Sequence, residues 1–556
     1  MTKGLVAVGV LLAVGSLQAQ QLSWSGGSST NWQDPANWGG TNVPDVSGEY
    51  ANFNYVGTPT LPLLLNGDVT LGAVTSPTAP AIRYANGSTT LTISGLNTPS
   101  NNTLTLLAGS GQYINVDGGA VGQIPRVSME NMNVVFNNTS GSVGGLVIGR
   151  SGVLTFGSTT NVTIANGSRL SISAVRDGDA GTVNINSASF NAGSNNAFMT
   201  VDQGTVNFGV GSFSTTAATP TLAITGKAKT SVVSPATLNF TSDYNSGATS
   251  GTIRAGSGNV SSAVVVSAAN GVKVTDAVEV AGYGNAGLTN SVVIGVTAAN
   301  STATFGGVHV EQYNNAGNTT TVSFTAASDS TAVFTGSVQG WRHSGITTGT
   351  TVFTKTGAGT VIFAGNDTTM WHDGNYAAAA GGAFDIQEGK LVLKSTASYT
   401  GASAMYINSI VRSGAILELG ASNQITNTAS LTLNGGTFDA NNFAETLGEL
   451  IVSANSFLSI DAGALLAFGS SQSDWGSFTL DITGTLDATG IRFGSSDAGL
   501  LASNLDNLLY NGQAGLITID ANGYLSAVPE PTSAAFLIAG LLGLGWVTRR
   551  RSAVSL

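Results

Sequence analysis

The feature that most constrains this chain is a long succession of short alternating runs, each closed by Gly, Asn or Ser, from about Thr58 to Ser330. Runs such as Thr103–Leu106, Val153–Phe156 and Gly204–Phe208 place apolar side chains on one face and Thr or Asn on the other. This alternation is typical of half-buried β-strands. The clearest tight turn is Asn166-Gly167-Ser168, because Asn-Gly readily adopts positive φ angles. We therefore expect an all-β fold.

Many short strands could build a sandwich, a barrel or a solenoid. Length favours the solenoid, since a single sandwich or barrel rarely exceeds about 250 residues, whereas stacked coils contact only their neighbours and can continue indefinitely. The same turn-rich texture persists through most of the 556 residues without a charged linker. We expect an elongated parallel β-helix over residues 58–527, with a row of separate β-sandwiches as the alternative.

Composition excludes several functional classes. Charged residues make up 9% of the chain, against about 25% in a typical soluble domain, while 42% hydrophobic residues argue against disorder. The net charge of -11 is spread thinly, and Arg549–Arg551 is the only basic cluster, so no nucleic-acid partner is expected. The absence of cysteine excludes disulfides, thiolate metal sites and cysteine nucleophiles.

The first nineteen residues have the pattern of a secretory signal peptide. Lys3 precedes an apolar run over Gly4–Leu17, and Leu17-Gln18-Ala19 is a cleavage-like sequence. A membrane span is the alternative, but the run is shorter than the 18 or more residues that a span needs. We expect export by the Sec machinery and cleavage by signal peptidase between Ala19 and Gln20.

Residues 528–556 form a second targeting segment. Pro529, Glu530 and Pro531 precede an uncharged run over Thr532–Thr548, which ends in Arg549, Arg550 and Arg551. This order resembles the PEP-CTERM sorting tail of exported bacterial proteins. The resemblance implies an exosortase-type membrane protease as partner. The arginines should stay on the cytoplasmic side, so a tail helix would anchor the chain transiently in the inner membrane before it reaches the cell surface or the medium.

The region 20–57 contains three of the seven tryptophans, Trp24, Trp32 and Trp38. One interpretation is a hydrophobic cap that plugs the first coil. The other is glycan contact, since an indole face stacks well on a sugar ring.

A segment at about 354–394 resembles the autotransporter-associated β-strand repeat, in which a Lys-Thr-Gly-x-Gly-Thr turn feeds one strand and a Gly-Lys/Thr-Leu-x-Leu strand closes the coil. The matching residues are Lys355, Thr356, Gly357, Gly359, Thr360, Gly389, Lys390, Leu391 and Leu393. The resemblance implies a right-handed β-helical passenger of a surface or secreted protein. An insertion with Met370, Trp371, His372 and Asp373 departs from the pattern, and weaker echoes follow at 414–419 and 431–438.

Near the C-terminus the period changes. Leu501, Leu505, Leu508 and Leu509 recur at helical spacing, and Ser503 and Asp506 are spaced like a capping box. We expect one short helix between 498 and 510 that packs as a lid on the last coil. A final strand or two should follow at 517–519 and 524–525.

Candidate chemical sites are few. Gly282, Gly284 and Gly287 match the dinucleotide fingerprint, but Ser291–Val296 after them has the pattern of a strand, where that fingerprint needs a helix. The histidines, His309, His343 and His372, lack closely spaced partners, so we expect no metal site and no cofactor.

Carboxylates provide the best enzyme candidate. Arg176, Asp177 and Asp179 share one turn, but one such turn offers too few oxygens for a calcium ion. The carboxylates of Glu445 and Glu449, and the Asp385, Glu388 pair, are interpreted as surface polar positions.

These observations predict a non-enzymatic protein of the cell surface or extracellular matrix. The alternative is a carbohydrate-active β-helix, either a polysaccharide lyase or an adhesin that binds extracellular polysaccharide.

Overall fold

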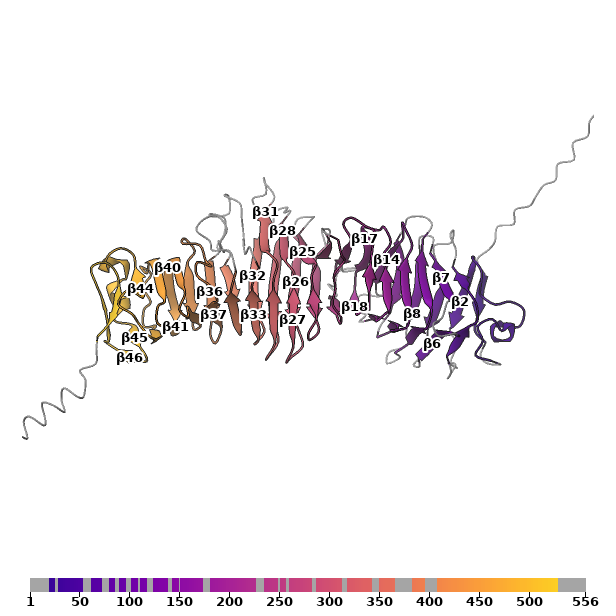
Figure 1. Cartoon of the computed structure of the whole chain (residues 1–556), viewed down its shortest axis with the longest axis horizontal. Coiled ribbons are helices and arrows are strands. Elements are labelled where there is room, and N and C mark those ends of the chain that lie inside the picture. The colour runs from indigo at the N-terminus through magenta and orange to yellow at the C-terminus, as the bar shows by residue number, and fades with distance from the viewer. Residues whose placement is uncertain are drawn as a thin grey trace, which may run out of the picture. The chain divides into compact units, whose positions relative to one another are not determined.

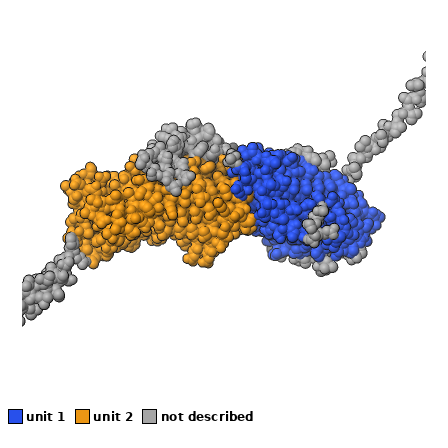
Figure 2. Space-filling model, in the orientation of Figure 1, with its two compact units in different colours: residues 1–238, 245–251 blue, residues 239–244, 252–556 orange. Residues whose placement is uncertain are grey.

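The computed structural model describes residues 20–25, 29–53, 62–72, 80–85, 90–96, 102–108, 111–117, 124–138, 143–149, 151–173, 181–226, 235–248, 251–256, 260–282, 287–312, 318–342, 350–365, 383–395 and 408–528. The chain divides into two compact units (Figures 1 and 2). Unit 1 contains residues 1–238 and 245–251, and unit 2 contains residues 239–244 and 252–556.

Unit 1 is a stack of coils, each of which contributes one strand to three sheets in turn. Every strand pairs in parallel with the equivalent strand of the next coil (Figure 1). The first sheet contains β1 (Gln20–Ser23), β2 (Glu49–Phe53), β5 (Ile82–Ala85), β8 (Gln112–Asp117), β11 (Val143–Ile148), β14 (Arg169–Ser173), β17 (Ala197–Val201) and β20 (Thr221–Ile224). The second contains β3 (Leu63–Leu65), β6 (Thr90–Gly95), β9 (Arg126–Glu130), β12 (Val153–Phe156), β15 (Thr182–Ile185) and β18 (Gly204–Phe208). The third contains β4 (Val69–Leu71), β7 (Thr103–Leu107), β10 (Asn133–Asn137), β13 (Asn161–Ile164), β16 (Ser189–Asn191) and β19 (Phe213–Ser214).

Unit 2 repeats this arrangement and then simplifies it, because coils from β34 onward contribute strands to only two sheets. Strand β21 (Ala236–Phe240) contains the boundary between the units in the sequence. The first sheet of unit 2 contains β22 (Thr252–Ala255), β25 (Ala277–Gly282), β28 (Val308–Gln312) and β31 (Val338–Arg342). The second contains β23 (Ser262–Ala268), β26 (Thr289–Val296), β29 (Thr319–Ala326), β32 (Thr350–Thr356), β34 (Ala383–Ile386), β36 (Asn408–Arg412), β38 (Leu431–Asn434), β40 (Ala444–Ala454), β42 (Leu465–Ser470) and β44 (Ile491–Phe493). The third contains β24 (Lys273–Val274), β27 (Thr302–Phe305), β30 (Thr331–Phe334), β33 (Thr360–Phe363), β35 (Lys390–Leu393), β37 (Ile416–Leu419), β39 (Thr437–Asp439), β41 (Ser456–Ile460), β43 (Leu480–Gly484) and β45 (Leu508–Tyr510).

The expected β-solenoid is therefore confirmed, and the alternative of separate sandwiches is wrong. Sandwiches are built from antiparallel sheets, whereas the sheets here pair in parallel and nearly in register. The predicted runs at 103–106, 153–156 and 204–208 are β7, β12 and β18. The Asn166-Gly167-Ser168 turn is also present, with Gly167 at φ 79°, but it is a corner between two sheets because β13 and β14 lie in different ones.

Burial follows the alternation that the sequence shows. Strands β12 and β13 bury every second residue, and their inward side chains stack on those of the next coil. In unit 2 the inward row of the third sheet includes stacked phenylalanines, such as Phe305 and Phe334, whose ring centroids are 5.2 Å apart. Such aromatic pairs add about 0.5–1.5 kcal/mol beyond the area they bury.

The C-terminal end differs in part from the expectation. The helix α1 (Ala502–Leu505) has only four residues, and its N-cap is Leu501 without a side-chain cap, so the predicted capping box is wrong. Leu508 and Leu509 belong to β45, which pairs in parallel with β43. The helical periodicity here arose because one helical turn and one strand follow each other closely.

Antiparallel strands end the described chain. Strand β46 (Gln513–Ala514) pairs with β45, and β47 (Ile517–Ile519) pairs with β48 (Leu525–Ala527), so the final strands predicted near 517–525 are confirmed. Among the helices of the described residues, none is both long and apolar enough to cross a membrane.

Glycine at coil corners provides the first prediction. Gly389 has φ 61°, and a Cβ there would lie 2.4 Å from the Gly359 carbonyl oxygen of the neighbouring coil, whereas Gly414, at φ 75°, would meet nothing within 4 Å. Alanine at either site should cost about 1–2 kcal/mol for the left-handed backbone, and Gly389→Ala should cost about 1–3 kcal/mol more through the clash. Guanidinium unfolding of the two variants measures this difference; equal midpoints would show that the corner tolerates a side chain.

Candidate functional site

The three N-terminal tryptophans lie in one buried cluster with Phe53. Trp24, Trp32 and Trp38 are 3%, 0% and 4% exposed. Trp24 packs edge-on to Trp38 at 5.2 Å between ring centroids, and Trp32 lies 5.0 Å from Trp38. Their indole faces are not available to a sugar, so the structure gives no support to glycan contact and favours the plug.

Indole hydrogen bonds and a short 3-10 helix hold the tryptophans of the plug in place. The Trp32 indole donates to the Pro44 carbonyl at 2.8 Å, and the Trp38 indole donates to the Trp32 carbonyl at 2.8 Å. A short 3-10 helix η1 (Pro35–Trp38), capped by the Asp34 side chain, brings Trp38 into the cluster. Strands β1 and β2 already belong to the first sheet, so coil stacking begins within the region expected to be a cap.

Lys355, at the start of the repeat-like segment, lies at a corner shared by two coils. Lys355 is fully buried, and its Nζ donates to the carbonyl oxygens of Thr356 at 3.1 Å, Gly357 at 2.6 Å and Glu388 at 2.7 Å. Burial lowers the pKa of Lys355 to about 8, although Glu388 acts in the opposite direction. The lysine therefore ties the backbone after β32 to the backbone before β35.

The glycines of this segment serve the same corner. Gly357 and Gly389 adopt positive φ, and a Cβ on Gly359 would lie 2.1 Å from the Ala327 carbonyl oxygen. Thr360 begins β33 and Lys390 begins β35, where strands were expected, whereas Lys355 and Thr356, which were expected in the turn, end β32.

A second buried polar group lies at another corner of unit 2. Glu445 is 2% exposed, so its interpretation as a surface position is wrong. Its Oε2 accepts from the backbone N–H of Gln424 at 2.6 Å and Ile425 at 3.2 Å, and its Oε1 accepts from the Thr446 N–H at 3.1 Å. Burial raises the pKa of Glu445 to about 7, and the three backbone donors act against that rise.

Glu445 continues a polar row along the coils. Gln424, which is also buried, accepts from the Ser395 N–H at 2.7 Å, and the Ser395 hydroxyl donates to the Gly365 carbonyl at 2.8 Å. These side chains replace strand hydrogen bonds at a corner where the backbone groups of neighbouring coils do not all pair. Their role is structural.

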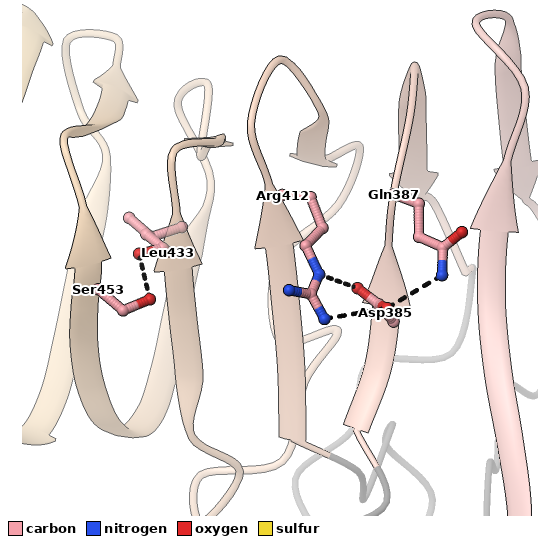
Figure 3. A network of polar contacts seen from close by, with 5 residues as sticks. All are labelled: Asp385, Gln387, Arg412, Leu433 and Ser453. Atoms are coloured by element: carbon pink, nitrogen blue, oxygen red, sulfur yellow. Dashed lines mark hydrogen bonds and ion pairs between the residues drawn. The ribbon is translucent and has the colours of Figure 1, made fainter.

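On the outer surface of unit 2, ion pairs link adjacent coils. Arg412 of β36 donates to both carboxylate oxygens of Asp385 of β34, at 2.8 and 3.3 Å, and Gln387 donates to the same carboxylate at 3.0 Å (Figure 3). Asp385 also raises the pKa of Arg412. Glu388, the predicted partner of Asp385, instead contributes its backbone carbonyl to Lys355.

The rest of the outer surface is largely neutral. In the third sheet of unit 1, the Asn161 amide donates to Asn133 at 3.0 Å, and the Ser189 hydroxyl donates to Asn161 at 2.7 Å. In the second sheet, Asn207 donates to Asn184 at 2.8 Å, and Asn184 donates to Thr155 at 3.1 Å. These rows link neighbouring coils through uncharged side chains.

Several predicted positions lie outside the described residues. They are Ala19, Gly284, Arg176, Asp177, Asp179, His343, His372, Pro529, Glu530, Pro531, Arg549, Arg550 and Arg551. Gly282 ends β25 and the strand β26 follows, so the dinucleotide fingerprint lacks its helix. Within the part of the chain that the structure describes, no three His, Asp or Glu side chains gather as a metal site.

Comparison with known proteins does not assign the chain to a family. No family model matches the chain, and neither a curated protein nor a solved structure matches it.

Lys355 allows a matched stability test. Lys355→Met should remove three charge-assisted hydrogen bonds from the corner, which should cost about 2–4 kcal/mol; the Thr356 carbonyl would keep its bond from the Thr325 hydroxyl. Lys390→Met is the control, because Lys390 makes a partly exposed ion pair with Glu418, a kind of pair that contributes under about 1 kcal/mol. Equal shifts of the guanidinium midpoint for both variants would contradict the assignment.

Glu445 predicts a pH-dependent stability. Burial raises the pKa of Glu445 to about 7 in the folded protein from the ordinary value of 4.5, so the folded state binds more protons between these two pH values. Its contribution is complete below about pH 4.5 and is lost as pH rises through 7, by at most about 3 kcal/mol. Glu445→Gln should remove this fall, as measured by unfolding midpoints from pH 4 to 8.

Glu449→Gln is the control for that experiment. Glu449 also accepts backbone N–H donors, from Gln472 and Ser473, but it is only half-buried. If Glu445→Gln and the unsubstituted protein show parallel pH profiles, the carboxyl does not titrate as proposed.

Proposed function

We propose that this chain is an exported, non-enzymatic protein of the cell surface or extracellular matrix, which acts through the extended surface of its β-solenoid. The observation that carries this proposal is a long, sparsely charged β-solenoid between two terminal segments that have targeting patterns. Strand β1 begins at Gln20 and β48 ends at Ala527. Cleavage between Ala19 and Gln20, and again at Pro529–Pro531, would therefore leave every described strand intact.

The outer surface supports the same function. Charges are sparse, and rows of Asn, Ser and Thr link neighbouring coils. With no cysteine in the sequence, the exported chain depends on this packing and hydrogen bonding for stability. A neutral hydroxyl and amide surface remains hydrated at any salt concentration, because it does not rely on screened charge pairs.

The proposed route has three partners, namely the Sec machinery, signal peptidase and an exosortase-type membrane protease. The uncharged run Thr532–Thr548 is just long enough to span a bilayer. Arg549–Arg551 would hold its end on the cytoplasmic side, which presents Pro529–Pro531 at the outer edge of the membrane. The anchor would be transient.

The alternative of a carbohydrate-active protein is the weaker one. The residues expected to contact the glycan are Trp24, Trp32 and Trp38, and all three side chains are buried. The lyase form of this alternative depends on Arg176, Asp177 and Asp179, which lie outside the described residues.

Mass spectrometry tests the proposal. When the full chain is produced in a bacterial host that contains an exosortase, the extracellular or surface fraction should lack peptides from Met1–Ala19 and from Thr532–Leu556. Replacement of Pro529, Glu530 and Pro531 by alanine should retain the arginine tail and leave the protein in the membrane fraction. An intact arginine tail on extracellular protein would rule out the processing.

A further inference from the structure

The mature N-terminus occupies a defined place in the solenoid. Gln20 is the first residue of β1, which is the edge strand of the first sheet in unit 1. Its backbone nitrogen donates to the Gly48 carbonyl oxygen at 2.9 Å, and its side chain is exposed. Two residues later, Leu22 is buried and fixes the strand to the core.

We propose that Gln20 is a modification site, at which the new N-terminal glutamine closes into pyroglutamate. The proposal rests on the proposed function, because the α-amine of Gln20 exists only after the signal peptide is removed. In this step the α-amino nitrogen attacks Cδ of its own side chain. The N–Cδ bond forms, the bond from Cδ to the side-chain nitrogen breaks, and ammonia leaves without any oxidant or reductant.

The reaction suits this residue for two reasons. An α-amine ordinarily has a pKa of about 8, so part of it is neutral and nucleophilic near pH 7. Amine and amide belong to the same residue, so their encounter is intramolecular and carries little entropic cost. The exposed side chain of Gln20 can turn back on the amine without disturbing Leu22 or the core.

The product changes the strand edge at one point. As in proline, ring closure places Cδ about where the backbone N–H of Gln20 pointed, so the hydrogen bond from Gln20 to the Gly48 carbonyl is lost. The positive charge of the terminus disappears, and the edge strand then begins with a neutral ring. The pairing of β1 with β2 from Gln21 opposite Tyr50 to Ser23 opposite Asn52 is not affected.

The modification has a consequence for the tryptophan plug. An aminopeptidase requires a free α-amine, and stepwise removal of four residues would take away β1 and reach Trp24. Loss of β1 would remove the buried Leu22 side chain from the first coil. It would also turn the Trp24 N–H, which donates to the Asn52 carbonyl, into the new chain terminus. A lactam at Gln20 therefore protects the first coil outside the cell.

The experiment measures the N-terminal peptide of the exported protein. A synthetic, isotope-labelled peptide with the sequence from Gln20 is added before digestion, so that cyclisation during handling is measured in the same sample. We expect the natural peptide to be lighter than uncyclised Gln20 peptide by one ammonia, while the labelled standard remains mostly open. Treatment with pyroglutamyl aminopeptidase should expose Gln21.

Gln20→Ala provides the matched variant, since alanine cannot form the lactam. The exported variant should lose N-terminal residues to an added aminopeptidase, whereas the natural protein should resist it. A peptide that starts at Gln20 with a free amine would overturn the modification and leave the export proposal standing. A peptide that retains Ala19 would overturn both the processing at Gln20 and the modification.

Discussion

The structure depends on one constraint, the parallel pairing of each strand with the equivalent strand of the next coil. Pairing in register places every side chain about 4.8 Å from its counterpart one coil away. Like charges at that distance repel each other, which accounts for the low share of charged residues. Opposite charges can pair between coils, as Arg412 does with Asp385 and Lys390 with Glu418. Asn, Ser and Thr can instead hydrogen-bond to copies of themselves in a row.

The same constraint explains how much of the fold could be predicted from the sequence. Inward rows need an apolar residue at every second position, so the strands at 103–107 and 153–156 were visible as alternation. Corners need glycine where a Cβ would meet a carbonyl of a neighbouring coil, and Gly357 and Gly389, which have such positions, were visible in the sequence as part of the repeat-like motif. The order of strands in sheets was also predictable, because stacked coils allow only one neighbour on each side.

What could not be predicted depends on contacts that lie far apart in the sequence. Glu445 was interpreted as exposed because a carboxylate usually is, and its donors on Gln424 and Ile425 lie about one coil earlier. The helix near 502 was overextended because Leu508 and Leu509 have helical spacing yet pair with β43. For Trp24, Trp32 and Trp38, the sequence left two interpretations open, and only their burial distinguishes a plug from a sugar platform.

The residues of the repeat-like segment show why a resemblance of this kind informs the fold more than the function. Lys355 binds three backbone carbonyls, and Gly357, Gly359 and Gly389 make room for the neighbouring coil. None of these groups faces outward with a reactive atom. β-Solenoids with different functions can therefore share the same corner residues. Function must then come from residues that the corner leaves free, and on the described outer surface these are mostly neutral hydroxyls and amides. The proposal of a structural surface protein rests on this difference between the buried corner residues and the neutral outer surface. The export part of the proposal rests on the targeting patterns of the two terminal segments.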